Sequence, residues 1–403
     1  MKKNIIYLLT LLLLCCFRQN IHAEYFRNLN LGNGLSQFSV MSICQDSLGR
    51  MWFGTHEGIN IYDGHHIRYY KGWVESGPGE KLWLGNSIDY IHCGNDGNIY
   101  FIADRNLFTY DIRCERFSQL TTGNQTSALT TTDTAIWYTR HDTLFVWDTQ
   151  KKQSLYVRNL PASDITALTI TRNGNIYIGT DNGIYIAQNA TDPNMKHQLQ
   201  NKGVHTIFES SSREIWIGTY MDGLYRIING KLINVPYSPH DGKGTSDRQI
   251  RQFTEDSQHN IWFGTFSGLE KYNPQTGLYT KIQIPQHVGG LSHPSLFALY
   301  TDRQGIIWLG SYYGGVSYFN PGKEEYLHYN YQSHAQPGIY YSYIGEMVQD
   351  NERNLWISTD GGGISQIGPG WNLLKQFTAG KADGLPHNNI KSIVYDPRRN
   401  NLY

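Results

Sequence analysis

Eight side chains suited to ligand binding lie beside or between copies of one recurring phrase of the sequence. Exposed aromatic rings stack on the apolar faces of sugars, carboxylates accept hydrogen bonds from hydroxyl groups, and guanidinium groups bind carboxylates or sulfates. The expected ligand-binding residues are Tyr220, Asp222, Arg248, Arg251, Phe266, Tyr312, Tyr313 and Asp360. An ordinary role in loops or in packing between repeats stays open as the alternative at each position.

The residues that commonly perform catalysis or bind metals do not occur in the required patterns. We find no H-x-x-x-H helix, no CxxC pair and no G-x-S-x-G elbow in a fitting context. His65 and His66 follow Asp63-Gly64, which predicts a solvated turn. The Asp-containing turns resemble the Asp boxes of sialidases, but their Asp-to-Gly spacing is one residue longer, which favours a structural role. We therefore expect no catalytic residue, no metal ligand and no cofactor.

The elements that must position the candidate residues are indicated by an internal repeat of about 45 residues. Its phrase is D-x-x-G-x-x-W-x-G-T followed shortly by G-L-x-x-Y. The strongest copies are Asp46 to Thr55, Asp256 to Thr265, Asp302 to Ser311 and Asp350 to Thr359. The aromatic anchors of successive copies are Trp52, Tyr100, Trp137, Tyr177, Trp216, Trp262, Trp308 and Trp356, with Tyr403 as a ninth.

Each repeat predicts four short antiparallel strands. Asp and Gly favour the tight turn between the first two strands, and the alternation of W-x-G-T directs the aromatic ring to one face of a sheet. The anchors are 37 to 48 residues apart, the length of one propeller blade. A blade cannot bury both faces alone, so several must stack. The sequence therefore predicts an all-β fold, a β-propeller of four-stranded antiparallel blades.

Closure of the ring predicts the domain organisation. Anchors Trp52 to Trp308 make seven blades, and the segment from Tyr25 to Asn30 is expected to supply the last strand of the seventh. Trp356 then begins a second propeller. The expected segments are a signal peptide over 1–23, a first propeller over 24–335 and the truncated start of a second over 336–403. The chain is thus expected to be a fragment or to be completed by a partner; an eight-bladed ring with a frayed tail is the alternative.

The N-terminus is typical of an export signal. Lys2 and Lys3 precede an apolar run from Ile5 to Phe17, and Ala23 provides a small residue for cleavage. We therefore expect an exported, periplasmic chain, with a retained signal anchor or lipidation at Cys15 or Cys16 as alternatives.

The charge balance and the cysteines exclude two further classes of protein. Lys+Arg and Asp+Glu are both 34, which gives no basic surplus for direct nucleic-acid binding. Cys44, Cys93 and Cys114 are too few and too scattered for a disulfide framework, and Cys44 is expected to fill the core.

The phrase NGLSQFSVMSICQDSLGRMWFGTHEGINIYDG and the other strong copies resemble the two-component regulator propeller repeat. This resemblance covers the chain from about Tyr25 onward and is loose around Tyr100 and Trp137. In that family, two seven-bladed propellers, a β-sandwich and a membrane helix precede cytoplasmic kinase, receiver and DNA-binding domains. The family senses oligosaccharides released from polysaccharides and controls the genes that degrade them.

The resemblance implies the periplasmic ligand-sensing propeller of a hybrid two-component protein anchored in the inner membrane. Its expected partners are an oligosaccharide, the rest of the sensor chain and a second copy in a homodimer. This chain is expected not to be an enzyme, since no kinase motif occurs in it. Two alternatives stay open: a secreted scaffold or adhesion propeller, and a propeller lyase or hydrolase, since virginiamycin-lyase-like propellers share short W-x-G-T phrases.

Overall fold

The structure is a computed structural model that describes residues 26–403 apart from 124, 133, 134, 150, 163, 283–289, 322–342, 370, 371, 382 and 383. It divides into two compact units, Met1–Lys323 and Glu324–Tyr403. Apart from one short 3-10 helix, Leu31–Asn33, the regular elements of these described residues are all strands. The all-β prediction is therefore confirmed. The expected signal peptide lies outside the described residues.

Within the described residues, the first unit holds seven four-stranded antiparallel sheets, here called blades 1 to 7 in chain order. Blades 1 to 3 are β2–β5 (Val40–Gln45, Met51–Thr55, Gly58–Tyr62, Ile67–Tyr70), β8–β11 (Ile88–Cys93, Ile99–Ala103, Asn106–Asp111, Arg116–Gln119) and β12–β15 (Thr126–Thr131, Ile136–Arg140, Thr143–Asp148, Gln153–Asn159). Blades 4 to 6 are β16–β19 (Ile165–Ile170, Ile176–Thr180, Gly183–Ala187, Lys196–Gln198), β20–β23 (Val204–Glu209, Ile215–Thr219, Leu224–Ile228, Lys231–Val235) and β24–β27 (Ile250–Glu255, Ile261–Thr265, Leu269–Asn273, Leu278–Lys281). Blade 7 combines β28 (Leu296–Thr301), β29 (Ile307–Ser311) and β30 (Val316–Phe319) with β1 (Arg27–Leu29).

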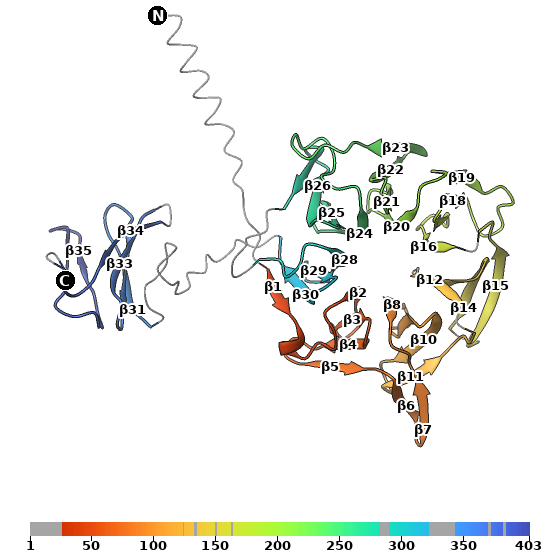
Figure 1. The fold of residues 1–403 in the computed structure, drawn as a ribbon, viewed down its shortest axis with the longest axis horizontal. Coiled ribbons are helices and arrows are strands. Elements are labelled where there is room, and N and C mark those ends of the chain that lie inside the picture. Colours follow the sequence, from red (N-terminus) through yellow and green to blue (C-terminus); the bar gives the residue numbers. More distant parts are fainter. Residues whose placement is uncertain are drawn as a thin grey trace, which may run out of the picture. The chain divides into compact units, whose positions relative to one another are not determined.

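The seven blades form a closed ring (Figure 1). The first strand of each blade contacts the first strands of its two neighbours, and β2 completes the circle by contacting both β8 and β28. At the closure, β1 pairs antiparallel with β30, with Arg27 opposite Tyr318 and Leu29 opposite Val316. The expected closing strand is thus confirmed, and seven sheets agree with the expected seven blades.

The aromatic anchors all lie on the second strand of a blade, as the repeat predicts. They pack across the boundary between blades: Trp52 of blade 1 lies 5.0 Å from Tyr110 of blade 2, measured between ring centroids. Trp308 of blade 7 lies 5.9 Å from Phe53 of blade 1 in the same way. Because each anchor is covered by the next blade, the core is a series of interblade layers.

The turn between the first two strands has one construction in blades 1, 6 and 7. In blade 7, one carboxylate oxygen of Asp302 accepts hydrogen bonds from two backbone N–H groups of the turn, and the other accepts one from Trp308 Nε1 at 2.8 Å. The same indole bond is made by Asp46 with Trp52 and by Asp256 with Trp262. The Asp of the motif therefore holds both the turn and the anchor.

Blade 5 departs from this construction. Ser210 stands six residues before Trp216, where the turns of blades 1, 6 and 7 have Asp. Trp216 is buried, and its Nε1 has no hydrogen-bond partner among the described residues. The guanidinium carbon of Arg226 lies 4.2 Å from the centroid of the Trp216 ring. Packing and a cation–π contact thus hold this anchor without the hydrogen bond.

The threonine and the glycine of the repeat also have a shared task. Thr55 Oγ1 donates a hydrogen bond to the carbonyl oxygen of Gly58 at 2.9 Å, across the loop between the second and third strands. Gly58 has a φ of +97°, and a Cβ there would lie 2.3 Å from the carbonyl oxygen of Tyr70. Only glycine fits this position, and the same bond holds the loop in blades 4 to 7.

A two-stranded hairpin, β6 (Trp73–Gly77) and β7 (Glu80–Trp83), is inserted between blades 1 and 2 and projects from the rim of the ring (Figure 1). Val74 packs into the core around blade 2. Trp73 and Trp83 are exposed cross-strand partners whose ring centroids lie 5.5 Å apart. This insertion accounts for the long spacing between the first two anchors.

The second unit contains one further four-stranded sheet, made of β31 (Ile344–Gln349), β32 (Leu355–Thr359), β33 (Gly363–Ile367) and β34 (Leu373–Phe377). A short pair, β35 (Tyr395–Asp396) and β36 (Asn401–Leu402), follows. Trp356 Nε1 donates to Asp350 at 2.8 Å, so the repeat continues here. The expected boundary at 335/336 lies outside the described residues.

Candidate functional site

Each inner strand of the ring begins with a β-bulge that sends one side chain toward the ring axis. The pairing between the first and second strands shifts register at the second residue of every inner strand, which leaves that residue without a partner. These seven bulge residues are Met41, Asp89, Ser127, Thr166, His205, Arg251 and Phe297. Six of them, all but Ser127, line the central cavity. We call the end of the cavity that they surround the mouth.

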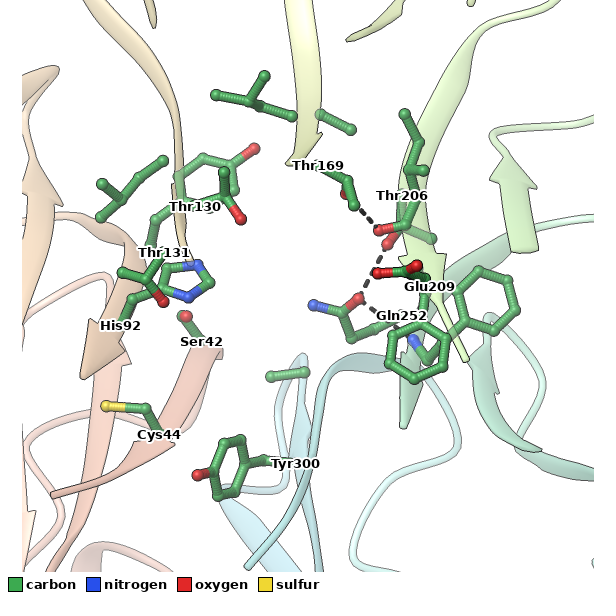
Figure 2. A pocket seen from close by; sticks show the side chains of 18 of the residues that line it. Ser42, Cys44, His92, Thr130, Thr131, Thr169, Thr206, Glu209, Gln252 and Tyr300 are labelled. Carbon is green, nitrogen blue, oxygen red and sulfur yellow. Dashed lines mark hydrogen bonds between the residues drawn. The ribbon is translucent and has the colours of Figure 1, made fainter. Parts of the chain in front are cut away.

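The cavity is a channel of about 1060 Å³ lined by all seven inner strands. Its wall is rich in hydroxyl and amide groups, including Ser42, Thr130 and Gln252 (Figure 2). Thr206 Oγ1 donates to Gln252 Oε1 at 2.8 Å, which joins the walls of blades 5 and 6. A ligand entering from the mouth would therefore meet polar groups able to bind hydroxyls.

Exposed aromatic rings gather at the mouth on three consecutive blades. Tyr220, Phe266 and Tyr312 each follow the second strand of blades 5, 6 and 7 and are 41%, 53% and 41% exposed. Each lies against the bulge residue of its own blade; the distances are 4.5 Å to the His205 ring, 5.4 Å from the Arg251 guanidinium carbon and 5.5 Å to the Phe297 ring. The structure thus brings these three predicted ligand-binding residues to the same end of the channel.

Tyr313 extends the same aromatic group. Its ring meets that of Tyr312 edge to face at 4.4 Å, and it is 59% exposed. Arg251, which the sequence also predicts, is half-buried among these rings. Its guanidinium carbon lies 4.1 Å from the centroid of Phe297. Five candidate residues, Tyr220, Phe266, Arg251, Tyr312 and Tyr313, are thus brought together.

The remaining three predicted ligand-binding residues, Asp222, Arg248 and Asp360, do not join this aromatic group. Asp222 is paired with Lys202 at 2.9 Å, so part of its hydrogen-bonding capacity is used. Arg248 lies in the loop before β24 rather than in the strand, with its guanidinium 5.1 Å from the centroid of Tyr237. Asp360 belongs to the second unit, where it pairs with Lys391 at 2.6 Å. These residues stay predictions without a common cavity.

Two histidines on the channel wall have strongly lowered pKa values. Burial lowers the pKa of His92 to about 4, and burial together with the positive charge of Arg251 lowers that of His205 to about 4. Both rings are therefore neutral at pH 7. His205 Nδ1 is buried without a hydrogen-bond partner among the described residues.

The sequence reasoning missed His205, Phe297 and Tyr90. Tyr90 Oη donates to the carbonyl oxygen of Thr166 at 2.8 Å, which links blade 2 to blade 4 at the mouth. A sequence signal could have identified His205 and Phe297. Like Arg251, both directly follow the first apolar residue of an inner strand and so occupy the same position in the repeat. The bulge makes this place face the channel.

One polar cluster at the opposite end of the ring has the residue types of a hydrolytic triad. Ser211 Oγ and Glu255 Oε1 both lie 2.9 Å from the same nitrogen, His259 Nδ1. A triad needs the two ring nitrogens to face different partners, so this arrangement cannot relay a proton from serine. Ser211 N also donates to Glu255, which identifies the cluster as a link between blades 5 and 6.

No group of three or more potential metal ligands occurs among the described residues, and within them no helix has the length and apolarity to span a membrane. In the same part of the chain the three cysteines are free, and Cys44 is buried as expected.

The matches to known proteins follow the repeat. The two-component regulator propeller model matches residues 34–57, 159–182, 244–267 and 290–313, each match containing the first two strands of a blade. Histidine kinase P4 from Formosa agariphila is 25% identical over 401 residues, which cover 91% of this chain and 28% of that protein. The chain thus spans about a quarter of that relative.

Among solved structures, the extracellular domain of a hybrid two-component system from B. thetaiotaomicron has a TM-score of 0.67 at 22% identity, covering 94% of this chain and 52% of that domain. The chain thus spans about half of that domain. Virginiamycin B lyase from Staphylococcus aureus has a TM-score of 0.56 at 12% identity, covering 73% and 98%. At these identities both likenesses show the fold alone. The matches identify copies of the two-component regulator propeller repeat in blades 1, 4, 6 and 7 of this chain.

Proposed function

We propose that this chain is the periplasmic ligand-sensing propeller of a hybrid two-component signalling protein and that its ligand is an oligosaccharide. The observation that carries the proposal is the group of exposed rings of Tyr220, Phe266, Tyr312 and Tyr313 at the mouth of a hydroxyl-lined channel. Aromatic rings beside polar groups suit sugars, whose faces are apolar and whose edges carry hydroxyls. The repeat matches and the likeness to an extracellular domain of a hybrid two-component system support the signalling role.

In this proposal the chain binds and does not catalyse. The ligand favours one arrangement of the sensor, and that bias passes to a kinase elsewhere in the full protein. The partners are the remaining parts of the sensor chain and a second copy of it, with a membrane anchor in the parent.

Calorimetric titration of the chain against neutral and acidic oligosaccharides tests the proposal. Saturable binding without change of the sugar, together with ligand-dependent signalling by the full-length parent, is the expected result. A folded chain that binds none of the panel, in a parent whose signalling ignores all of it, would contradict the oligosaccharide assignment. Product formation would favour an enzyme instead.

A further inference from the structure

Arg251 differs from the other arginines with a buried, unbonded nitrogen, Arg50, Arg158 and Arg226, because its side chain has no polar partner at all among the described residues. Several arginines have one buried nitrogen without a hydrogen bond, but Arg50 and Arg226 pair with Asp46 and Glu214 through another nitrogen. Among the described residues, no ion pair or hydrogen bond involves the side chain of Arg251, and its Nη1 is buried.

Asp247 is the acidic residue whose charge acts on Arg251, but its carboxylate already accepts other hydrogen bonds. Its two carboxylate oxygens accept hydrogen bonds from the backbone N–H groups of Gln249 and Ser267, at 3.0 and 2.9 Å. Burial consequently lowers the pKa of Arg251, since Asp247 only partly offsets the lost hydration. The protein thus holds a partly desolvated cation at the mouth and leaves it uncompensated.

The surroundings of Arg251 leave its hydrogen-bond donors available. The guanidinium carbon lies 4.1 Å from the centroid of Phe297 and 5.4 Å from that of Phe266, and an aromatic ring accepts no conventional hydrogen bond from the guanidinium N–H groups. The five N–H donors of a guanidinium point outward in its plane, in a fork that matches a carboxylate or sulfate. The rings therefore fix the orientation of the fork without satisfying it.

The mouth is also uneven in charge. The bulge residues of blades 5 to 7 are His205, Arg251 and Phe297, whereas blade 2 contributes Asp89 on its side of the ring. His205 is neutral at pH 7, so it adds no second positive charge. An anionic group is consequently attracted to Arg251 and repelled from the side of Asp89.

Resting on the proposed function, we infer that the oligosaccharide carries an anionic substituent, a carboxylate or a sulfate, and that Arg251 binds it in the plane of its guanidinium. The sugar ring then stacks on the adjacent aromatic side chains, Tyr312 and Phe266 foremost. Arg251 thereby selects acidic sugars over neutral ones of the same shape.

The experiment measures binding of matched sugar pairs by calorimetry. One pair is a galacturonic acid trisaccharide and its fully methyl-esterified form; the other is lactose 3′-sulfate and lactose. The variants are Arg251→Met, Arg251→Lys and, as a control with the same charge change on an exposed turn of blade 2, Arg113→Met. Free sulfate and glucuronate are titrated alongside, and thermal unfolding of each variant establishes that it is folded.

Binding of one acidic member at least about tenfold tighter than its neutral partner supports the inference if Arg251→Met abolishes the difference. Arg251→Lys should retain part of it, and Arg113→Met all of it. Since the cation has no partner to lose, Arg251→Met should unfold no earlier than the wild type. If this variant does not fold, Arg251→Lys carries the test.

The remaining outcomes separate the two proposals. Equal binding of acidic and neutral members, or a preference that survives Arg251→Met, overturns the anionic selectivity while leaving the oligosaccharide proposal standing. Binding of free anions through Arg251 with no sugar bound supports the anion site and contradicts the oligosaccharide. A folded chain that binds neither class overturns both.

Discussion

The two ends of the blades differ in whether their buried polar side chains have hydrogen-bond partners. At one end, the Asp–Trp turns of blades 1, 6 and 7 repeat the same carboxylate and indole contacts, and each Asp is fully paired. At the mouth, the bulge residues differ from blade to blade, and Arg251 and His205 keep buried donors unpaired. The repeated end holds the ring together, and the varied end is where a ligand can be recognised.

The largest expected effect is on stability and comes from the repeated end. Asp302→Ala leaves the Trp308 indole and two backbone N–H groups unpaired, so the free energy of unfolding should fall by about 3 kcal/mol. Urea unfolding measures the change. Asp181→Ala, an exposed carboxylate beside the mouth, is the control and should change stability by less than about 0.5 kcal/mol. Equal effects of the two would remove the distinction between the ends.

Acidification should weaken the fold through the two histidines of the channel wall. The pKa values of His92 and His205, about 4 in the folded chain, lie below the ordinary value of 6.5, so the unfolded state binds more protons between these limits. Stability should thus be full above pH 6.5 and fall by on the order of 2 kcal/mol per histidine as the pH approaches 4.

The double variant His92→Asn, His205→Asn tests this pH dependence by urea unfolding at several pH values. Its stability should be flatter than that of the wild type between pH 6.5 and 4. A wild-type curve without a slope in this window would show that the rings are not held neutral.

A smaller expected effect concerns ligand affinity. Tyr312→Ala removes one ring of the mouth and should weaken the binding of any oligosaccharide found to bind by about tenfold. Leu48→Ala removes an apolar side chain that is even more exposed than Tyr312, in the turn of blade 1, and should leave affinity unchanged. Calorimetry on both variants shows whether ligand affinity depends on exposed apolar area in general or on the position of the ring at the mouth.

The smallest expected effect is a gain. Ser210→Asp would give blade 5 the carboxylate that the turns of blades 1, 6 and 7 have, six residues before the unpaired Trp216. We expect the free energy of unfolding to rise by about 1 kcal/mol. A lower midpoint in urea would mean that the Arg226 contact with Trp216 has already replaced the turn of the other blades.

The strands were predictable because the residue pattern within each repeat specifies its local structure. The alternation of W-x-G-T and the glycine that follows specify two strands and the loop between them, and a period near 45 residues then fixes a blade. The closing strand at Arg27–Leu29 was predictable from its likeness to other outer strands.

The site was predictable only in part. Tyr220, Phe266 and Tyr312 follow a visible motif, but the bulges that direct His205 and Phe297 into the channel depend on strand register, which single residues do not reveal. The pairing of Asp222 with Lys202, 20 residues earlier, depends likewise on how loops meet in space.

The closing strand also sets an order of events when the chain is made. Ser317 Oγ donates a hydrogen bond to the side-chain oxygen of Asn28, 289 residues earlier. The strand β1 therefore cannot pair until blade 7 has been synthesised. Until β1 has paired, β30 exposes an unpaired edge that can capture a strand from another molecule. Ring completion should therefore be a late, slow step of folding, and a chain shortened by β1 should fail by aggregating rather than by losing its blades one by one.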